Sequence, residues 1–151
     1  MGEVRVSARL RNFVDVALAE RAGGNLDQVA TSWLDCLVDT GALMVLLPQD
    51  EVGKLGLAPG GRVIVTHADD RREELPTARG LEVTILGRTM VTDCVVGPPL
   101  CEPLIGQLVL EELDLVVDRA RQSLGPRPES PNLPLLKLKS APSVGEKTEP
   151  Q

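Results

Sequence analysis

The chain has 151 residues, enough for one domain with its own hydrophobic core. Hydrophobic residues make up 42% of it, but only one Trp and one Phe are present, so the core has to be aliphatic, which suits short strands. The net charge is -6 and no Lys/Arg cluster occurs, which argues against a nucleic-acid partner. No apolar stretch is long enough to cross a membrane, so we expect a soluble, cytoplasmic protein without a membrane partner.

The first third of the chain predicts two pairs of strands. Residues 4–10 alternate apolar and polar side chains, the pattern of a strand with one wet face, and residues 13–18 are predicted as its hairpin partner. After a glycine-containing loop, strands are expected over residues 31–38 and 45–47. A short helix is then expected over residues 48–55, because Pro48 is tolerated at the first helical position and Gly56 can end the helix.

A charged segment divides the middle of the chain. Residues 69–74 carry only charged side chains and lie between apolar runs at residues 62–66 and 75–86, so they are predicted to form the tip of a solvated hairpin. Another strand is expected over residues 89–96, where Gly97 and two prolines end it.

The last part of the chain predicts a short apolar stretch, a helix, a strand and a tail. Residues 104–106 are apolar and end in glycine, residues 107–113 have a helical pattern, and residues 115–117 are expected to form a strand. Six of the twelve prolines lie from residue 125 onward. We therefore predict one domain over residues 1–124 and a proline-rich, largely extended or disordered tail over residues 125–151.

The cysteines and the histidine point to no metal or thiol chemistry. Cys36, Cys94 and Cys101 are odd in number and lack the paired spacing of zinc sites, so we interpret them as reduced thiols that pack as small apolar side chains. A catalytic cysteine needs a base, and nothing in the sequence places His67 beside a cysteine. No metal site and no cofactor is predicted.

Residues 38–42 form the most informative motif of the chain. They place the Asp39 carboxylate at the end of an apolar run and follow it with a hydroxyl, a glycine and a small side chain. Gly41 lets its N–H reach the carboxylate, and Ala42 avoids crowding where two loops meet. Two carboxylates that share one proton can activate a water molecule. The chain contains this motif only once and so supplies one of the two carboxylates. A chain with one such loop has to dimerise to use this chemistry.

This motif, together with Leu104, Ile105 and Gly106, resembles the retropepsin-like (retroviral-type) aspartic proteases, and most closely their small bacterial type. The resemblance implies an all-β fold, a closed barrel or sandwich lobe with one or two short helices that acts as a homodimer. It implies that Asp39 is catalytic and that Thr40, Gly41 and Ala42 support the catalytic loop. It also implies that the element at residues 104–106 threads beside that loop and supports it.

The resemblance also implies a substrate and a flap. In that family a hairpin closes over the substrate, and the hairpin whose tip contains Asp69, Asp70, Arg71 and Arg72 is the matching candidate. The implied function is an aspartic endopeptidase that binds a peptide or protein in extended conformation and hydrolyses it with water activated between two Asp39 carboxylates.

One alternative stays open. The residue after Ala42 is commonly polar in such enzymes but is Leu43 here, and the tip at residues 69–74 is charged and lacks the glycine-rich character of viral flaps. A catalytically inactive dimeric module with the same fold, which binds peptides or has a structural role, accounts for the same motifs. Hydrolysis of a peptide library, and its loss in the Asp39→Asn variant, distinguishes the two.

Overall fold

The computed structural model describes residues 2–138, and β-strands dominate them. Three short helices interrupt the strands, and none of the helices in this range is long and apolar enough to span a bilayer. The strands are β1 (Arg5–Asn12), β2 (Thr31–Val38), β3 (Val45–Pro48), β4 (Ala58–Thr66), β5 (Arg72–Ile85), β6 (Arg88–Gly97), β7 (Leu104–Ile105), β8 (Leu115–Asp118) and β9 (Ser123–Pro126). The helices are α1 (Phe13–Arg21), α2 (Gln49–Leu55) and α3 (Gln107–Leu113), with a 3-10 turn at Leu26–Gln28.

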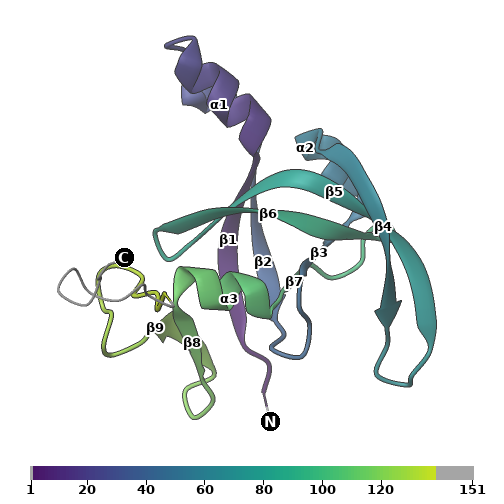
Figure 1. The fold of residues 1–151 in the computed structure, drawn as a ribbon, viewed down its shortest axis with the longest axis vertical. Coiled ribbons are helices and arrows are strands. Elements are labelled where there is room, and N and C mark those ends of the chain that lie inside the picture. The colour runs from purple at the N-terminus through teal and green to yellow at the C-terminus, as the bar shows by residue number, and fades with distance from the viewer. Residues whose placement is uncertain (1, 139–151) are drawn as a thin grey trace, which may run out of the picture.

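The main sheet closes on itself (Figure 1). Its order over the described residues is β1-β2-β7-β3-β6-β5-β4, and β1 also pairs with β5. Arg11 of β1 therefore faces Thr31 of β2 on one side and Glu82 of β5 on the other. This second pairing closes the six strands β1, β2, β7, β3, β6 and β5 into a ring. Strand β4 pairs with β5 outside the ring. The predicted all-β class is confirmed.

The interior of the ring is aliphatic, as the composition requires. The largest fully buried side chains include those of Leu10, Leu47, Leu81, Ile85 and Ile105. Each such side chain contributes about 1.5–3 kcal/mol through removal of apolar surface from water. The two aromatic residues lie outside this core, since Phe13 is 41% and Trp33 is 64% exposed.

The predicted hairpin partner at residues 13–18 is wrong, because this segment is the start of helix α1. The Asn12 side chain caps the helix by accepting a hydrogen bond from the N–H of Val14 at 2.9 Å. Asp15 lies in the first turn and Arg21 in the last, where the charge of each interacts favourably with the helix dipole. The antiparallel partner of β1 is β2 instead. A cap residue followed by an acidic first turn was the signal in the sequence.

The other predicted elements of the body form close to where they were expected. Helix α2 follows Pro48 and ends at Gly56, whose φ of 67° is the left-handed conformation that glycine adopts without strain. Helix α3 has the predicted bounds, and β4 and β5 flank a charged turn. The hairpin prediction for residues 69–74 is confirmed in position, although β5 already begins at Arg72.

The chain continues to pack on the body beyond the predicted domain end at residue 124. Strand β9 pairs with β8, with Gly125 opposite Val116 and Pro126 opposite Leu115. Further on, Ser130 is 4% exposed. The predicted boundary therefore falls within β9, and the part of the predicted tail from residue 139 onward lies outside the described residues.

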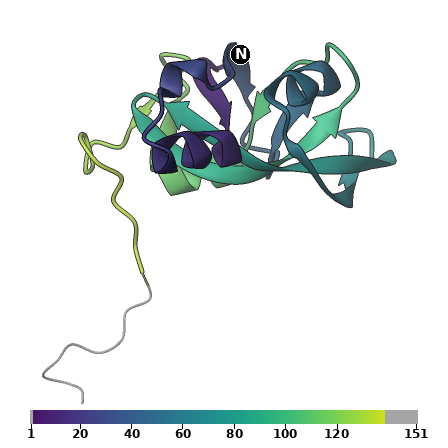
Figure 2. The ribbon, with the colours of Figure 1, turned by 90° about the horizontal axis from the view of Figure 1, so that it is seen from above.

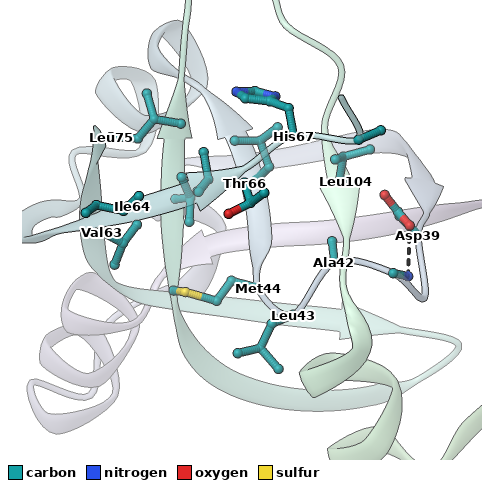
Figure 3. Close-up of a pocket in the computed structure, with 15 residues that line it drawn as sticks. Asp39, Ala42, Leu43, Met44, Val63, Ile64, Thr66, His67, Leu75 and Leu104 are labelled. Atoms are coloured by element: carbon teal, nitrogen blue, oxygen red, sulfur yellow. Dashed lines mark hydrogen bonds between the residues drawn. The ribbon is translucent and has the colours of Figure 1, made fainter. Parts of the chain in front are cut away.

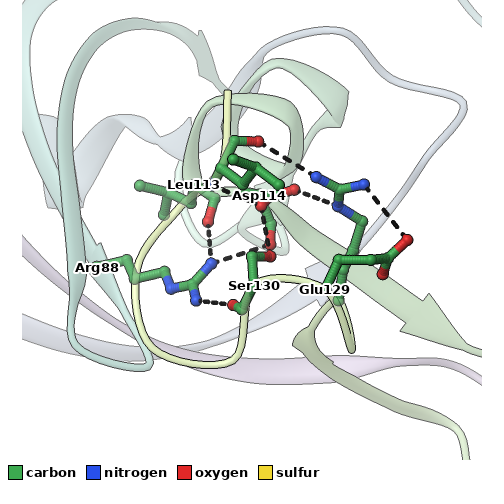
Figure 4. Close-up of polar contacts among 7 residues, drawn as sticks. Arg88, Leu113, Asp114, Glu129 and Ser130 are labelled. Atoms are coloured by element: carbon green, nitrogen blue, oxygen red, sulfur yellow. Dashed lines mark hydrogen bonds and ion pairs between the residues drawn. The ribbon is translucent and has the colours of Figure 1, made fainter. Parts of the chain in front are cut away.

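A polar cluster fixes this C-terminal segment to helix α3 (Figure 4). The buried guanidinium of Arg88 donates to the carbonyls of Leu113 at 2.8 Å, Asp114 at 3.0 Å and Ser130 at 2.6 Å. The carboxylate of Asp114 accepts from Arg127, from Ser130 Oγ at 2.6 Å and from the N–H of Leu135 at 2.8 Å. We call these five groups, of Arg88, Asp114, Arg127, Ser130 and Leu135, the Asp114 cluster.

Stability is expected to fall in acid through the Asp114 cluster. Hydrogen bonds from Arg127, Ser130 and Leu135 hold the pKa of Asp114 well below its ordinary value. A carboxylate whose pKa is lowered by folding stabilises the protein fully above its unfolded pKa of about 3.9 and loses this contribution as the pH falls below it. Denaturant midpoints should therefore drop more steeply below about pH 4 in the wild type than in Asp114→Asn. Parallel slopes in the two proteins would contradict this role of Asp114.

Candidate active site

The Asp39 loop, residues 39–42, begins where β2 ends. The N–H of Asp39 donates to the carbonyl of Ile105 at 2.9 Å, and the N–H of Ala42 donates to the carbonyl of Asp39 at 3.1 Å, which closes a tight turn. Within the turn the N–H of Gly41 donates to Oδ1 of Asp39 at 2.9 Å. This bond fixes the orientation of the carboxylate. Asp39 is half-buried, whereas Thr40 and Gly41 are exposed.

The predicted supporting element lies directly beside this loop. Leu104 pairs in parallel with Leu37, and Ile105 with Val38, so β7 lies alongside the end of the strand that delivers Asp39. Gly106 follows and is buried against the loop, where a Cβ atom would lie 2.5 Å from the carbonyl oxygen of Met44. Only glycine allows this approach of the two backbones.

The first N–H groups of helix α3 donate to carbonyls of the Asp39 loop and of the residue that follows it. The N–H of Gln107 donates to the carbonyl of Ala42 at 2.8 Å, and the N–H of Leu108 donates to the carbonyl of Leu43 at 3.0 Å. These are backbone donors that a helix N-terminus leaves unpaired. No side chain caps the helix, so the loop itself is its N-terminal cap. The loop, Gly106 and α3 therefore hold one another in place.

An apolar cleft of about 750 Å³ opens beside Asp39 (Figure 3). The β4 side of the β4–β5 hairpin lies across it from the Asp39 loop. Among the lining residues Asp39 is the only acid, and His67 is the only other ionisable group. The remaining lining is mostly aliphatic: Ala42, Leu43, Met44, Leu46, Val63, Ile64, Val65, Leu75, Val95 and Leu104.

The hairpin contributes to the cleft through β4, the two residues that follow it and Leu75 of β5, and not through its tip. Residues 63–68 line the cleft, whereas the predicted flap residues Asp69, Asp70, Arg71 and Arg72 lie in and just after the turn, beyond the lining. Within the turn the N–H of Asp70 donates to the carbonyl of His67 at 2.9 Å, and Asp70 has a φ of 66°. Residues 63–68 were not predicted to line the site, because a charged tip is more conspicuous in the sequence than the short apolar run before it.

His67 is held where β4 ends. Its Nε2 lies 2.9 Å from Oε1 of Glu73 on β5, a contact that joins the two strands at the base of the turn. No motif in the sequence places His67 near Asp39. The only signal was its position directly after the strand that lines the cleft.

A second, smaller hollow of about 320 Å³ lies on the other side of the Asp39 loop. Asp39 and Thr40 line it together with Leu37 and Val38, and the N-terminal segment and the β8–β9 hairpin form its other walls through Gly2, Glu3, Val4, Val117 and Arg119. Asp39 therefore borders two open spaces, one apolar and one more polar. The exposed side of its loop is accessible to another chain.

The cysteines form no part of this site. All three are free, and Cys36 and Cys94 are fully buried. Burial raises the pKa of both thiols to about 12, so they stay protonated at neutral pH and are poor nucleophiles. The prediction of reduced thiols packed in the core is confirmed for these two, while Cys101 is partly exposed. No group of three metal-ligating side chains occurs between residues 2 and 138.

No family model matches the chain, and no curated protein matches it significantly in sequence. Function therefore has to be inferred from the loop, the cleft and the chemistry that they allow.

Proposed function

We propose that this protein is an aspartic endopeptidase that works as a homodimer, with one Asp39 from each subunit in a shared site. The observation that carries the proposal is a single carboxylate, fixed by the N–H of Gly41, at the edge of an apolar cleft that contains no second acid. Hydrolysis by paired carboxylates needs two of them, so the second has to come from another copy. The exposure of Thr40 and Gly41 leaves the loop open to such a copy.

The chemistry follows from two carboxylates that share one proton. The ionised Asp39 takes a proton from a water molecule held between the pair, and the water oxygen attacks the peptide carbonyl. The protonated Asp39 of the other subunit donates to the carbonyl oxygen, and collapse of the tetrahedral intermediate transfers a proton to the leaving amine. Because one carboxylate has to be ionised and the other protonated, activity should have a bell-shaped dependence on pH.

The substrate is a peptide in extended conformation. Strand β4 lines the cleft and is the last strand in the sheet order of the described residues, so its outer edge offers backbone groups for pairing. The aliphatic lining favours apolar substrate side chains. We place the enzyme in the cytoplasm, where its free thiols stay reduced.

An inactive peptide-binding module is the second candidate. Leu43 is 62% exposed at the cleft and offers a substrate no side-chain hydrogen bond, which favours binding without turnover. A library of peptides incubated with the wild-type protein tests both. Endopeptidase activity predicts new N-termini within apolar sequences, whereas capture of the same peptides without cleavage would favour the module.

A further inference from the structure

The C-terminal segment, residues 127–138, follows β9 and exposes four leucines. Leu133, Leu135, Leu136 and Leu138 are 76%, 55%, 52% and 81% exposed, and the segment forms neither helix nor strand. Figure 2 shows it leaving the body as an extended chain. Exposed apolar side chains that gather in one place mark an interaction site.

The Asp114 cluster holds the middle of this segment. Oδ2 of Asp114 accepts from the N–H of Leu135 at 2.8 Å, and Nη2 of Arg127 donates to the carbonyl of Leu135 at 3.2 Å. That carbonyl belongs to the peptide bond between Leu135 and Leu136. While the segment is docked, both polar backbone groups of Leu135 are engaged with the body, and the bond cannot enter a cleft.

The segment is complementary to the cleft in chemistry. The cleft is lined mainly by aliphatic side chains, and its ionisable residues are Asp39 and His67, so it contains no permanent positive charge. The segment supplies leucines on both sides of one bond and the cation of Lys137. An extended chain can also pair with the open edge of β4, where Ile64 is 68% exposed.

The cleft that receives the segment belongs to another molecule. In Figure 2 the segment leaves the body on the side away from the β4–β5 hairpin, which carries one wall of the cleft. The hydrogen bonds from Leu135 to Asp114 and from Arg127 to Leu135, which we call the clamp, hold Leu135 beside the C-terminal end of helix α3. Resting on the proposed function, we propose that the C-terminal segment of one molecule is a substrate of another, cut between Leu135 and Leu136, and that the clamp by Asp114 and Arg127 protects this bond until the segment is released.

The cleavage step is a simple hydrolysis. The oxygen of water bonds to the carbonyl carbon of Leu135, and the bond from that carbon to the nitrogen of Leu136 breaks. One proton of the water passes through the Asp39 pair to the amine of Leu136, and the hydroxyl completes the new carboxyl group of Leu135. Nothing besides water is consumed.

The test follows the intact mass of the purified full-length chain over time. The wild-type protein should lose residues 136–151, and the fraction lost per hour should rise with protein concentration, because two molecules have to meet. Asp39→Asn should keep its full mass. Asp114→Asn, which tolerates the left-handed backbone at this position, should lose the tail about tenfold faster, because it removes the charge that holds Arg127.

A synthetic peptide of residues 131–140 keeps the inference testable if a variant folds poorly. The wild-type protein should cut it at the central bond and should leave the same peptide with Leu135→Asp and Leu136→Asp intact. Cleavage of an unrelated peptide library without cleavage of this peptide or of the tail would overturn the inference and leave the proposed function standing. If neither the library nor this peptide is cleaved, both the inference and the proposed function are overturned. Equal tail loss in Asp114→Asn and the wild type would overturn protection by the clamp.

Discussion

Replacement of Asp39 by Asn is expected to lower kcat/KM for peptide hydrolysis about a thousandfold or more, because an amide can neither take a proton from water nor donate one in return. The folded state should survive. The bond from the N–H of Gly41 to Oδ1 at 2.9 Å needs only an acceptor, and the Asn side chain offers one. The measurement is initial rates on a peptide from the library, together with the denaturant midpoint of each protein.

The matched control is Asp93→Asn. Asp93 is an exposed acid on strand β6 that does not line the cleft, so its replacement changes the net charge equally without touching the site. Its activity should equal that of the wild type. Full hydrolysis by Asp39→Asn would remove this carboxylate from the mechanism, and loss of activity in both variants would point to a general effect of charge.

Gly106→Ala is expected to destabilise the fold by about 3 kcal/mol and to lower activity with it. A Cβ atom at this position would lie 2.5 Å from the carbonyl oxygen of Met44 and 2.7 Å from the carbonyl carbon of Leu43. Both contacts are with backbone, which cannot move aside as a flexible side chain can. The loop and helix α3 would have to separate, and Asp39 would move with them.

Gly53→Ala provides the control for the chemistry of the substitution. Gly53 lies within helix α2, and a Cβ atom there has nothing within 4 Å. Alanine is the better helix former, so this variant should be as stable as the wild type or more stable by up to about 1 kcal/mol. Chemical denaturation followed by circular dichroism measures both variants. A Gly106→Ala protein with the midpoint of the wild type would contradict the close packing inferred for this position.

The position of the Asp39 loop could be predicted from the sequence because every residue near it carries local information. Residues 31–38 read as a strand and form one, so Asp39 had to lie at its end. That Leu104, Ile105 and Gly106 thread beside the loop was implied by the family resemblance and not by local pattern, and the N–H of Asp39 donates to the carbonyl of Ile105 in this arrangement. Short motifs with specific backbone requirements are legible in a single sequence.

Other features depended on contacts that no local pattern encodes. Residues 13–18 are apolar enough for a strand, and helix α1 prevails through the cap that Asn12 provides, while the same side chain donates to the carbonyls of Leu55 and Gly56. The wall of the cleft formed by residues 63–68 arises because the β4–β5 hairpin lies across from the Asp39 loop in the folded chain. The docking of residues 127–135 requires Arg88 and Asp114, which come together only in the folded chain.

The central claim, that two chains each contribute one Asp39 to a common site, is tested most directly by mixing. Wild-type protein is unfolded and refolded with a tenfold excess of Asp39→Asn, so that most wild-type chains pair with a variant chain. A shared site predicts that hydrolysis per wild-type chain falls about tenfold by mass action, while the same excess of Asp93→Asn produces no fall. Unchanged hydrolysis in the presence of excess Asp39→Asn would mean that each chain acts alone, which contradicts the account.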